Sequence, residues 1–183
     1  MRVIAGLYGG RVLKTPPDNR TRPTSDRLRE TLFNILAPNI SEDTRFLDLC
    51  AGTGAIGIEA LSRGAAFVTF VDRSRRSCAL IEENLDKLEI PENQTEVVQA
   101  AAETFAGRQH ERGWDICFYD PPYGDDYSIV MHEFGTNPLL LNTGGLLIVE
   151  HRTKTGAPDA VGDIRRWRVL KQGETSLSFY EHE

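Results

Sequence analysis

Residues 46–57 read Phe-Leu-Asp-Leu-Cys-Ala-Gly-Thr-Gly-Ala-Ile-Gly, so that an apolar strand runs directly into a glycine-rich turn. Gly52, Gly54 and Gly57 have the spacing G-x-G-x-x-G, and a helical pattern follows them. Asp72 stands about 20 residues after Gly52, at the end of the next predicted strand. Glycines allow close approach of a ligand, and the acid can accept hydrogen bonds from a ribose diol. The stretch therefore predicts a ribose-bearing cofactor, with a glycine turn beside a helix-capping acid as the plainer alternative.

The order of predicted elements indicates the α/β class. Strands alternate with helices from residue 45 to residue 150, which predicts a mostly parallel, Rossmann-like sheet with helices on both faces. Two last strands, at 166–170 and 176–181, have no helix between them and should pair antiparallel. The other expected elements are a hairpin within 2–13, helices from Thr24 to Pro38 and at 55–62, 75–88, near Glu103 and 127–141, and strands at 45–50, 67–71, 96–99, 116–119 and 146–150.

Asp48, inside the first strand, helps to distinguish between two adenosine cofactors. A dinucleotide places its pyrophosphate at the start of the following helix, where a nearby carboxylate would repel it. S-adenosylmethionine has no phosphate, and its ammonium group can bind Asp48 directly or through water. We therefore expect S-adenosylmethionine; the alternative is that Asp48 is buried and caps its own turn.

A second informative stretch, Asp120-Pro121-Pro122-Tyr123, follows the predicted strand at 116–119. The carboxyl ends of parallel strands share one edge of a sheet, so this corner and the glycine turn should line one cleft. Two prolines stiffen the corner and remove two donors, which leaves the Asp120 carboxylate and the Pro121 carbonyl to accept hydrogens from an NH2 group. Tyr123 can stack on an unpaired or flipped base. The corner indicates methyl transfer to an exocyclic amine of a nucleic-acid base.

Charge is distributed unevenly along the chain. The net charge of the 183 residues is −6, which alone argues against a nucleic-acid partner. Residues 1–29, however, hold seven basic and two acidic side chains. We interpret residues 1–23 as a basic N-terminal arm that contacts RNA and residues 24–183 as the catalytic domain; a solvated run of charge is the alternative. The phosphate contacts expected in the arm are Arg11, Lys14, Arg20 and Arg22.

Composition argues against several other classes of protein. No apolar run approaches the length of a membrane span, and the N-terminus does not have the pattern of a signal peptide. The three cysteines and four histidines are scattered and show no metal-binding spacing. We expect a cytoplasmic monomer that holds no metal and contacts no membrane.

Several stretches resemble a known family. Residues 120–123 look like motif IV of the amino-directed nucleic-acid methyltransferases, and residues 48–54 look like their motif I. Arg-Pro-Thr-Ser-Asp-Arg-Leu-Arg-Glu-Thr-Leu-Phe-Asn at 22–34 is similar to the start of the RsmD family, and Gly-Glu-Thr-Ser-Leu-Ser-Phe-Tyr at 173–180 resembles its end. The RsmD family contains 16S rRNA guanine-N2 methyltransferases. The resemblance implies a seven-stranded methyltransferase sheet with a reversed last strand, S-adenosylmethionine as donor, and a small-subunit rRNA guanine as acceptor.

Motifs and resemblance together define the candidate site. The catalytic candidates are Asp120, Pro121, Pro122 and Tyr123. The cofactor-binding candidates are Thr24, Asp48, Cys50, Ala51, Gly52, Thr53, Gly54, Asp72, Arg73, Ala101 and Ala102. Ala101 stands where related enzymes often carry Asp or Asn, so backbone groups of Ala101 and Ala102 would have to bind the adenine edge.

Three alternative functions are left open by the sequence. A DNA adenine-N6 methyltransferase would use the same corner, and only the resemblance at the two ends of the chain favours rRNA. An NAD-dependent oxidoreductase would share the glycines and Asp72, but it would leave Asp48 and the corner at 120–123 unexplained. A non-enzymatic RNA-binding module fits poorly with the acidic body of the chain.

Overall fold

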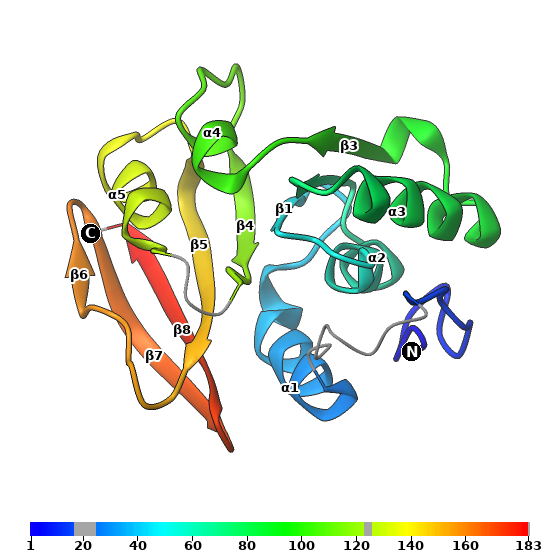
Figure 1. The fold of residues 1–183 in the computed structure, drawn as a ribbon, viewed down its shortest axis with the longest axis horizontal. Helices are drawn as coiled ribbons and strands as arrows, with labels where there is room; N and C mark the ends of the chain where they lie inside the picture. The colour runs from blue at the N-terminus through cyan, green and yellow to red at the C-terminus, as the bar shows by residue number, and fades with distance from the viewer. Residues whose placement is uncertain (17–24, 123–125, 183) are drawn as a thin grey trace.

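A single eight-stranded sheet organises the residues that a computed structural model of the chain describes, namely 1–16, 25–122 and 126–182 (Figure 1). The strands are β1 Arg45–Leu49, β2 Phe67–Asp72, β3 Thr95–Gln99, β4 Trp114–Tyr119, β5 Leu141–Arg152, β6 Ala160–Val161, β7 Ile164–Gln172 and β8 Thr175–His182. The helices are α1 Asp26–Leu36, α2 Ala55–Ser62, α3 Arg75–Leu88, α4 Ala102–Ala106 and α5 Ser128–Thr136, with 3-10 turns at Ala37–Asn39 and Glu92–Gln94. None of these helices is long and apolar enough to cross a membrane.

Strand order places a switch point at the centre of the sheet. The order is β3-β2-β1-β4-β5-β8-β7-β6, and β1 to β5 pair in parallel. After β1 the chain adds strands on one side, and with β4 it continues on the other, which is where open α/β sheets bind ligands. The glycine turn follows β1 and the Asp-Pro-Pro corner follows β4, so both lie at this switch point.

The last strands reverse direction, as expected. β8 pairs antiparallel with both β5 and β7, which confirms the reversed last strand and the terminal antiparallel pair. The prediction of seven strands is one short, because β6 forms a further antiparallel edge beside β7. β6 contains only two residues, too few to leave an alternating pattern in the sequence.

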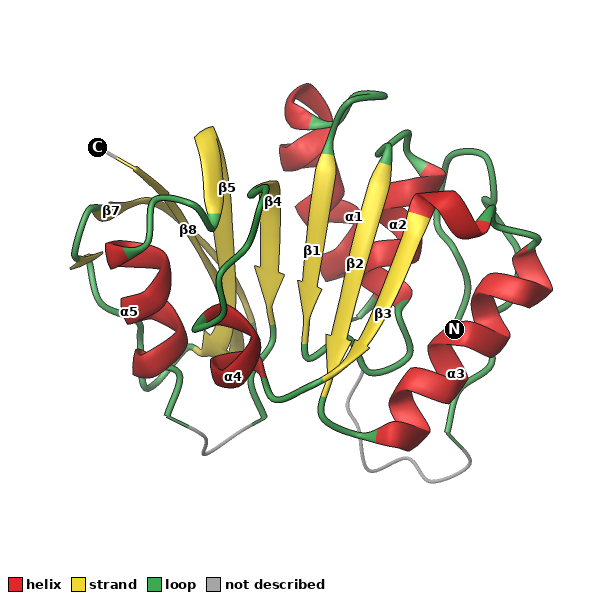
Figure 2. Cartoon of the chain, turned by 90° about the horizontal axis from the view of Figure 1, so that it is seen from above, coloured by secondary structure: helices red, strands yellow, loops and turns green. Residues whose placement is uncertain are grey.

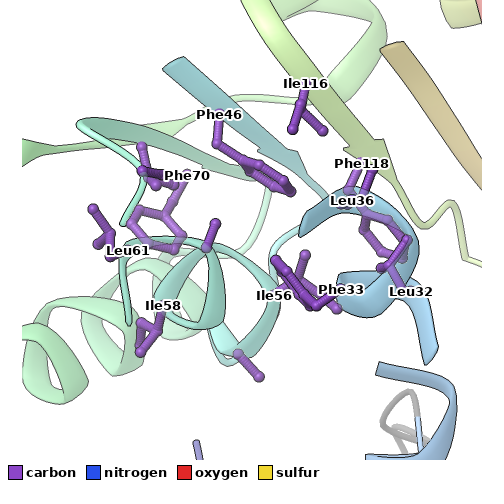
Figure 3. Packing of buried hydrophobic residues seen from close by; sticks show 14 of the residues in the cluster. Leu32, Phe33, Leu36, Phe46, Ile56, Ile58, Leu61, Phe70, Ile116 and Phe118 are labelled. Carbon is purple, nitrogen blue, oxygen red and sulfur yellow. The ribbon is translucent and has the colours of Figure 1, made fainter. Parts of the chain in front are cut away.

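Helices cover both faces of the sheet. The apolar cluster on one face contains side chains from α1, α2 and α3, and the cluster on the other contains side chains from α4 and α5. Figure 2 shows α4 and α5 in front of the sheet and α1 and α2 behind it. On the α1–α2 face, Phe46 of β1 stacks on Phe33 of α1 with 6.2 Å between ring centroids (Figure 3). Burial of these apolar side chains holds the short helices in place, since isolated helices of this length are marginal in water.

The first sixteen residues form a tight loop against α2. Arg2 and Val12 make one isolated antiparallel bridge, so the predicted hairpin is present but shorter than expected. Val3, Tyr8 and Leu13 are buried in the same apolar cluster as α1 and α2. These residues therefore belong to the core of the sheet domain.

Hydrogen bonds from α2 fix this loop. The Glu59 carboxylate accepts from the N–H groups of Ile4 and Ala5, at 2.8 and 3.1 Å. A Cβ on Gly6 would lie 1.8 Å from the Ser62 carbonyl oxygen, so only glycine allows the loop to approach α2 so closely. The N-terminal loop is thus tied to the helix that begins at the glycine turn.

Predicted element ends are wrong mainly where a proline intervenes. α2 and α3 have the expected bounds, and Ser25 caps α1 by accepting the N–H of Leu28 at 3.2 Å. The predicted helix at 127–141 is too long, because α5 ends at Thr136. Pro138 disfavours helical geometry in the residue before it, Asn137. The chain then enters β5 five residues earlier than expected, at Leu141.

Candidate active site

The glycine turn after β1 has left-handed backbone geometry. Cys50, Gly52 and Gly54 have φ angles of 63°, 58° and 77°. Such angles are strained for a residue with a side chain, and strain of this kind is concentrated at ligand sites. A Cβ on Gly57 would lie 2.3 Å from the ring of Phe70, so the third glycine lets α2 pack closely on β2. The three glycines have the geometry that the motif predicts.

Asp72, at the end of β2, connects the turn to the neighbouring strands. Its Oδ2 accepts the N–H of Gly52 at 2.9 Å, and its Oδ1 accepts the N–H of Ser74 at 2.8 Å. Its backbone carbonyl accepts the N–H of Ala100, just after β3, at 3.1 Å. Each carboxylate oxygen has two lone pairs, so Asp72 keeps acceptor capacity for hydroxyl groups of a ligand.

Asp48 is buried beneath the turn. Its side chain is 2% exposed, and Oδ2 accepts the N–H of Gly57 at 2.9 Å. This bond is the turn-capping role that the sequence leaves as the alternative. Burial raises the pKa of Asp48 to about 7, the Gly57 bond lowers it, and the charge of Asp72 raises it. Asp48 therefore changes charge near neutral pH, and a cation that binds nearby would lower its pKa and favour the carboxylate.

The corner after β4 lies directly beside the glycine turn. The N–H of Asp120 donates to the carbonyl of Leu49 at 3.3 Å and so extends the parallel pairing of β1 with β4. Pro121 is buried and Pro122 is exposed, while Tyr123 lies outside the described residues. The corner therefore lies next to the glycine turn, as expected, because one backbone hydrogen bond joins it to the last residue of β1.

Carboxyl groups concentrate at these strand ends. Burial raises the pKa of Asp120 well above its ordinary value, and the charges of Glu150 and Asp48 raise it further. The side chain of Glu150, on β5, is 5% exposed. Any of these groups that is ionised repels a pyrophosphate, so the strand ends suit a cofactor without phosphate.

The remaining cofactor-binding candidates occupy different surroundings. Ala101 is the N-cap residue of α4, next to the residue that bonds to Asp72. Ala102 is buried in the apolar cluster, so its side chain packs against the core. Arg73 is exposed directly after β2, and Thr24 lies outside the described residues.

Asn84 on α3 has no role in the sequence-based expectations, yet it anchors the turn. Its side-chain NH2 donates to the carbonyls of Thr53 and Lys14, at 3.1 and 3.2 Å, and its Oδ1 accepts the N–H of Lys14 at 2.7 Å. On the other side of the turn, Ala51 donates to the carbonyl of Val71 at 3.0 Å. A polar residue on the apolar stripe of a helix is the sequence feature that could have revealed Asn84.

Two basic residues of the N-terminal loop, Arg11 and Lys14, are engaged with α3. The Arg11 guanidinium donates to two backbone carbonyls at the C-terminal end of α3, at 3.0 and 3.3 Å. The Lys14 ammonium lies 3.0 Å from the Glu83 carboxylate, and both side chains are about half exposed. The other expected phosphate contacts, Arg20 and Arg22, lie outside the described residues.

Comparison with known proteins places this chain in a family. A family model described as "Conserved hypothetical protein 95" matches residues 1–181. Ribosomal RNA small subunit methyltransferase D from Haemophilus influenzae is 40% identical over 181 residues, which cover 98% of this chain and 91% of the relative. The protein of the same name from Escherichia coli is 35% identical over 188 residues, covering 100% and 90%. The chain belongs to the RsmD family.

Solved structures agree with membership of the RsmD family. One from Escherichia coli has a TM-score of 0.89 at 33% identity and covers 100% of this chain and 98% of its own. Another, from Haemophilus influenzae, has a TM-score of 0.82 at 29% identity, with coverages of 99% and 97%. This RsmD-family chain is a methyltransferase with a Rossmann-like sheet, as the motifs predict.

The strand ends fit the methyl donor that the RsmD resemblance implies. A Cβ on Gly52 would have no neighbour closer than the Cys50 carbonyl oxygen at 4.0 Å, so the turn leaves room for a ligand. The Asp48 carboxyl group suits the ammonium charge of S-adenosylmethionine. Within the described part of the chain, no group of His, Cys, Asp and Glu side chains could hold a metal ion.

Proposed function

We propose that this chain transfers a methyl group from S-adenosylmethionine to the exocyclic N2 amine of a guanine in the 16S rRNA of the small ribosomal subunit. The observation that carries the proposal is the hydrogen bond from Asp120 to Leu49, which sets a corner rich in acceptors beside the glycine turn. The names of the Haemophilus influenzae and Escherichia coli relatives support the small-subunit RNA as substrate.

The corner holds and orients the amine. The N2 amine of guanine is a weak nucleophile because its lone pair is delocalised into the ring. The Asp120 carboxyl and the Pro121 carbonyl accept its two hydrogens and turn the lone pair toward the methyl donor. Tyr123, outside the described residues, stacks on the flipped base. Positioning and charge placement supply the rate enhancement, and no metal is required.

The strand ends hold the donor. Bound S-adenosylmethionine supplies a methyl group on a cationic sulfur. Asp72 accepts its ribose hydroxyls, Asp48 attracts its ammonium, and the backbone of Ala101 and Ala102 binds the adenine edge. The amine that has gained a methyl group is acidic, and the raised pKa of Asp120 suits this carboxyl to take the released proton.

Transfer of label from S-adenosylmethionine tests the proposal. The protein is incubated with undermethylated small-subunit particles, free 16S rRNA and duplex DNA, and the nucleosides are separated by mass spectrometry. We expect N2-methylguanosine from one of the RNA substrates. N6-methyladenine from DNA would instead support the adenine alternative, and label in neither nucleic acid would overturn both.

A further inference from the structure

Glu150 is a buried carboxyl group to which the proposed chemistry gives no role. It ends the apolar run Leu146-Leu147-Ile148-Val149 of β5, and its side chain is 5% exposed. Burial of a carboxylate is costly unless specific partners compensate it, so such groups are frequent at functional sites. Its position in the sheet shows what it can reach.

The register of the sheet places Glu150 beside Asp120. Tyr119 of β4 and Val149 of β5 are the last paired residues of these parallel strands, so the next residues on the two chains are Asp120 and Glu150. Neighbouring strands lie about 4.8 Å apart. The two carboxyl-bearing residues are therefore one strand spacing apart at the carboxyl edge of the sheet, where the corner begins.

Side-chain alternation places Glu150 on the same sheet face as the site. Ile148, two residues earlier on β5, belongs to the apolar cluster on the α1–α2 face, and so does its neighbour Phe118 on β4. Tyr119 and Val149 belong to the opposite cluster. Because alternate residues of a strand share a face, Glu150 points to the α1–α2 side, as Asp48 does. The charge of Glu150 is the largest electrostatic contribution to the raised pKa of Asp120, in agreement with this proximity.

A second acceptor beside the amine-holding corner matches the edge of guanine. The N2 amine of guanine is adjacent to N1–H, so this edge presents donors at both positions. In adenine the exocyclic amine is adjacent to an unprotonated N1, which is an acceptor. We propose that Glu150 accepts the N1–H of the target base while the corner holds N2, and that Glu150 thereby selects guanine over adenine.

The selection combines attraction with repulsion. Guanine satisfies the buried carboxylate with a hydrogen bond, whereas adenine would bring a lone pair against it. Sites built to hydrogen-bond a particular N–H discriminate strongly against analogues that lack it. This inference rests on the proposed function, since it assumes that the acceptor is a guanine N2 amine.

The test compares guanine with 2-aminopurine, which keeps the C2 amine but has no hydrogen on N1. After the methylated position has been mapped, ligated 16S rRNA is made with either base at that position, and kcat/KM for methyl transfer is measured. Wild-type protein should prefer guanine by about 10- to 100-fold, the range expected for one hydrogen bond to a charged group. Glu150→Gln should reduce this preference to a few-fold, with S-adenosylmethionine affinity changed by less than about 3-fold.

Two further variants sharpen the result. Glu150→Asp keeps the charge and should retain a preference for guanine, at a lower rate. Glu181→Gln makes the same chemical change at an exposed position of the neighbouring strand β8 and should behave as wild type. Thermal unfolding of each variant confirms that it is folded before the rates are compared.

The outcomes separate this inference from the function on which it rests. If wild type methylates guanine but Glu150→Gln keeps the full preference over 2-aminopurine, the inference alone is overturned. It is also overturned if Glu150→Gln weakens S-adenosylmethionine as much as it weakens transfer, because Glu150 would then act on the donor. If wild type methylates no guanine, the proposed function fails as well.

Discussion

Burial of Asp48 at the proposed donor site has a cost in stability. Its pKa is about 7 in the folded protein against about 3.9 in an unfolded chain, so the folded state binds the proton more tightly. The stability contributed by this group is therefore fully present below about pH 4 and is lost as the pH rises to about 7. Asp48→Asn keeps an acceptor for the Gly57 N–H and removes the titration. Relative to wild type, the variant should gain on the order of 2–3 kcal/mol between pH 5 and pH 8 in urea unfolding.

Glu59→Gln is the matched control for the sign of this effect. Glu59 is also a fully buried carboxylate, but Arg63 lies 2.8 Å from it and two N–H groups donate to it. Loss of its charge should destabilise the protein at pH 8, because a paired buried charge loses its partner. A destabilised Asp48→Asn at pH 8 would show that Asp48 has a compensating partner in the free protein.

Asp120 should matter for transfer and little for binding of the donor. Asp120→Ala removes the acceptor that we propose orients the amine, and we expect methyl transfer to fall by 100-fold or more, the scale seen when one preorganised catalytic group is lost. Calorimetry should find S-adenosylmethionine affinity within a few-fold of wild type. Asp120→Asn keeps one acceptor oxygen in a similar shape and should fall between wild type and alanine. Near-normal turnover of Asp120→Ala would mean that the corner is structural.

At the scale of elements, α3 supports the glycine turn through Asn84. Asn84→Ala leaves the Thr53 carbonyl and both backbone groups of Lys14 without their side-chain partner, so the free energy of unfolding should fall by about 1–3 kcal/mol. The turn loses an anchor, and S-adenosylmethionine affinity should fall in calorimetry as well. Leu85→Ala, a buried neighbour on the same helix, is the control: it should cost about 2–5 kcal/mol of stability but leave donor affinity unchanged. Equal donor affinity in Asn84→Ala and wild type would contradict the anchoring role.

Elements were predictable where local chemistry decides them. The helices after Gly54 and Ser74 begin at a glycine turn and at a serine cap, and their ends follow from the sequence. The stretch at 127–141 has the composition of one helix, and only the restriction that Pro138 imposes on Asn137 divides it between α5 and β5. β6 is a two-residue strand that forms by pairing with β7, so no local sequence pattern predicts it.

At the scale of the whole molecule, the site was predictable in part because its residues depend on different kinds of information. Asp48 and Asp72 lie near the carboxyl ends of strands and Asp120 directly follows one, all at motif positions, and parallel strands bring their ends together. Glu150 and Asn84 belong to no recognisable motif. Glu150 lies near the corner because β5 pairs with β4, and Asn84 contacts the N-terminal loop because that loop packs on α3. Spatial neighbours of this kind are fixed by the tertiary fold and are invisible to local patterns.

The charge asymmetry of the whole chain predicts where RNA is held, although Arg11 and Lys14 also have partners on α3. Replacing Arg11, Lys14 and Arg20 by alanine should flatten the log–log dependence of 16S rRNA affinity on salt by roughly 0.7–0.9 for each lost phosphate contact. S-adenosylmethionine affinity should not change. Arg108→Ala with Arg112→Ala removes two exposed cations from the connection between α4 and β4 and should leave the slope unaltered.

Unfolding measurements must accompany this experiment, because Arg11 caps the C-terminal end of α3 and its loss reduces stability as well as charge. The salt slope is insensitive to that loss as long as the protein stays folded, since the slope counts the counterions released on binding. Equal slopes for the triple variant and wild type would exclude phosphate contacts from the arm. Recognition would then have to come from another basic surface, such as β7, where Trp167 is 45% exposed and is followed by the exposed Arg168.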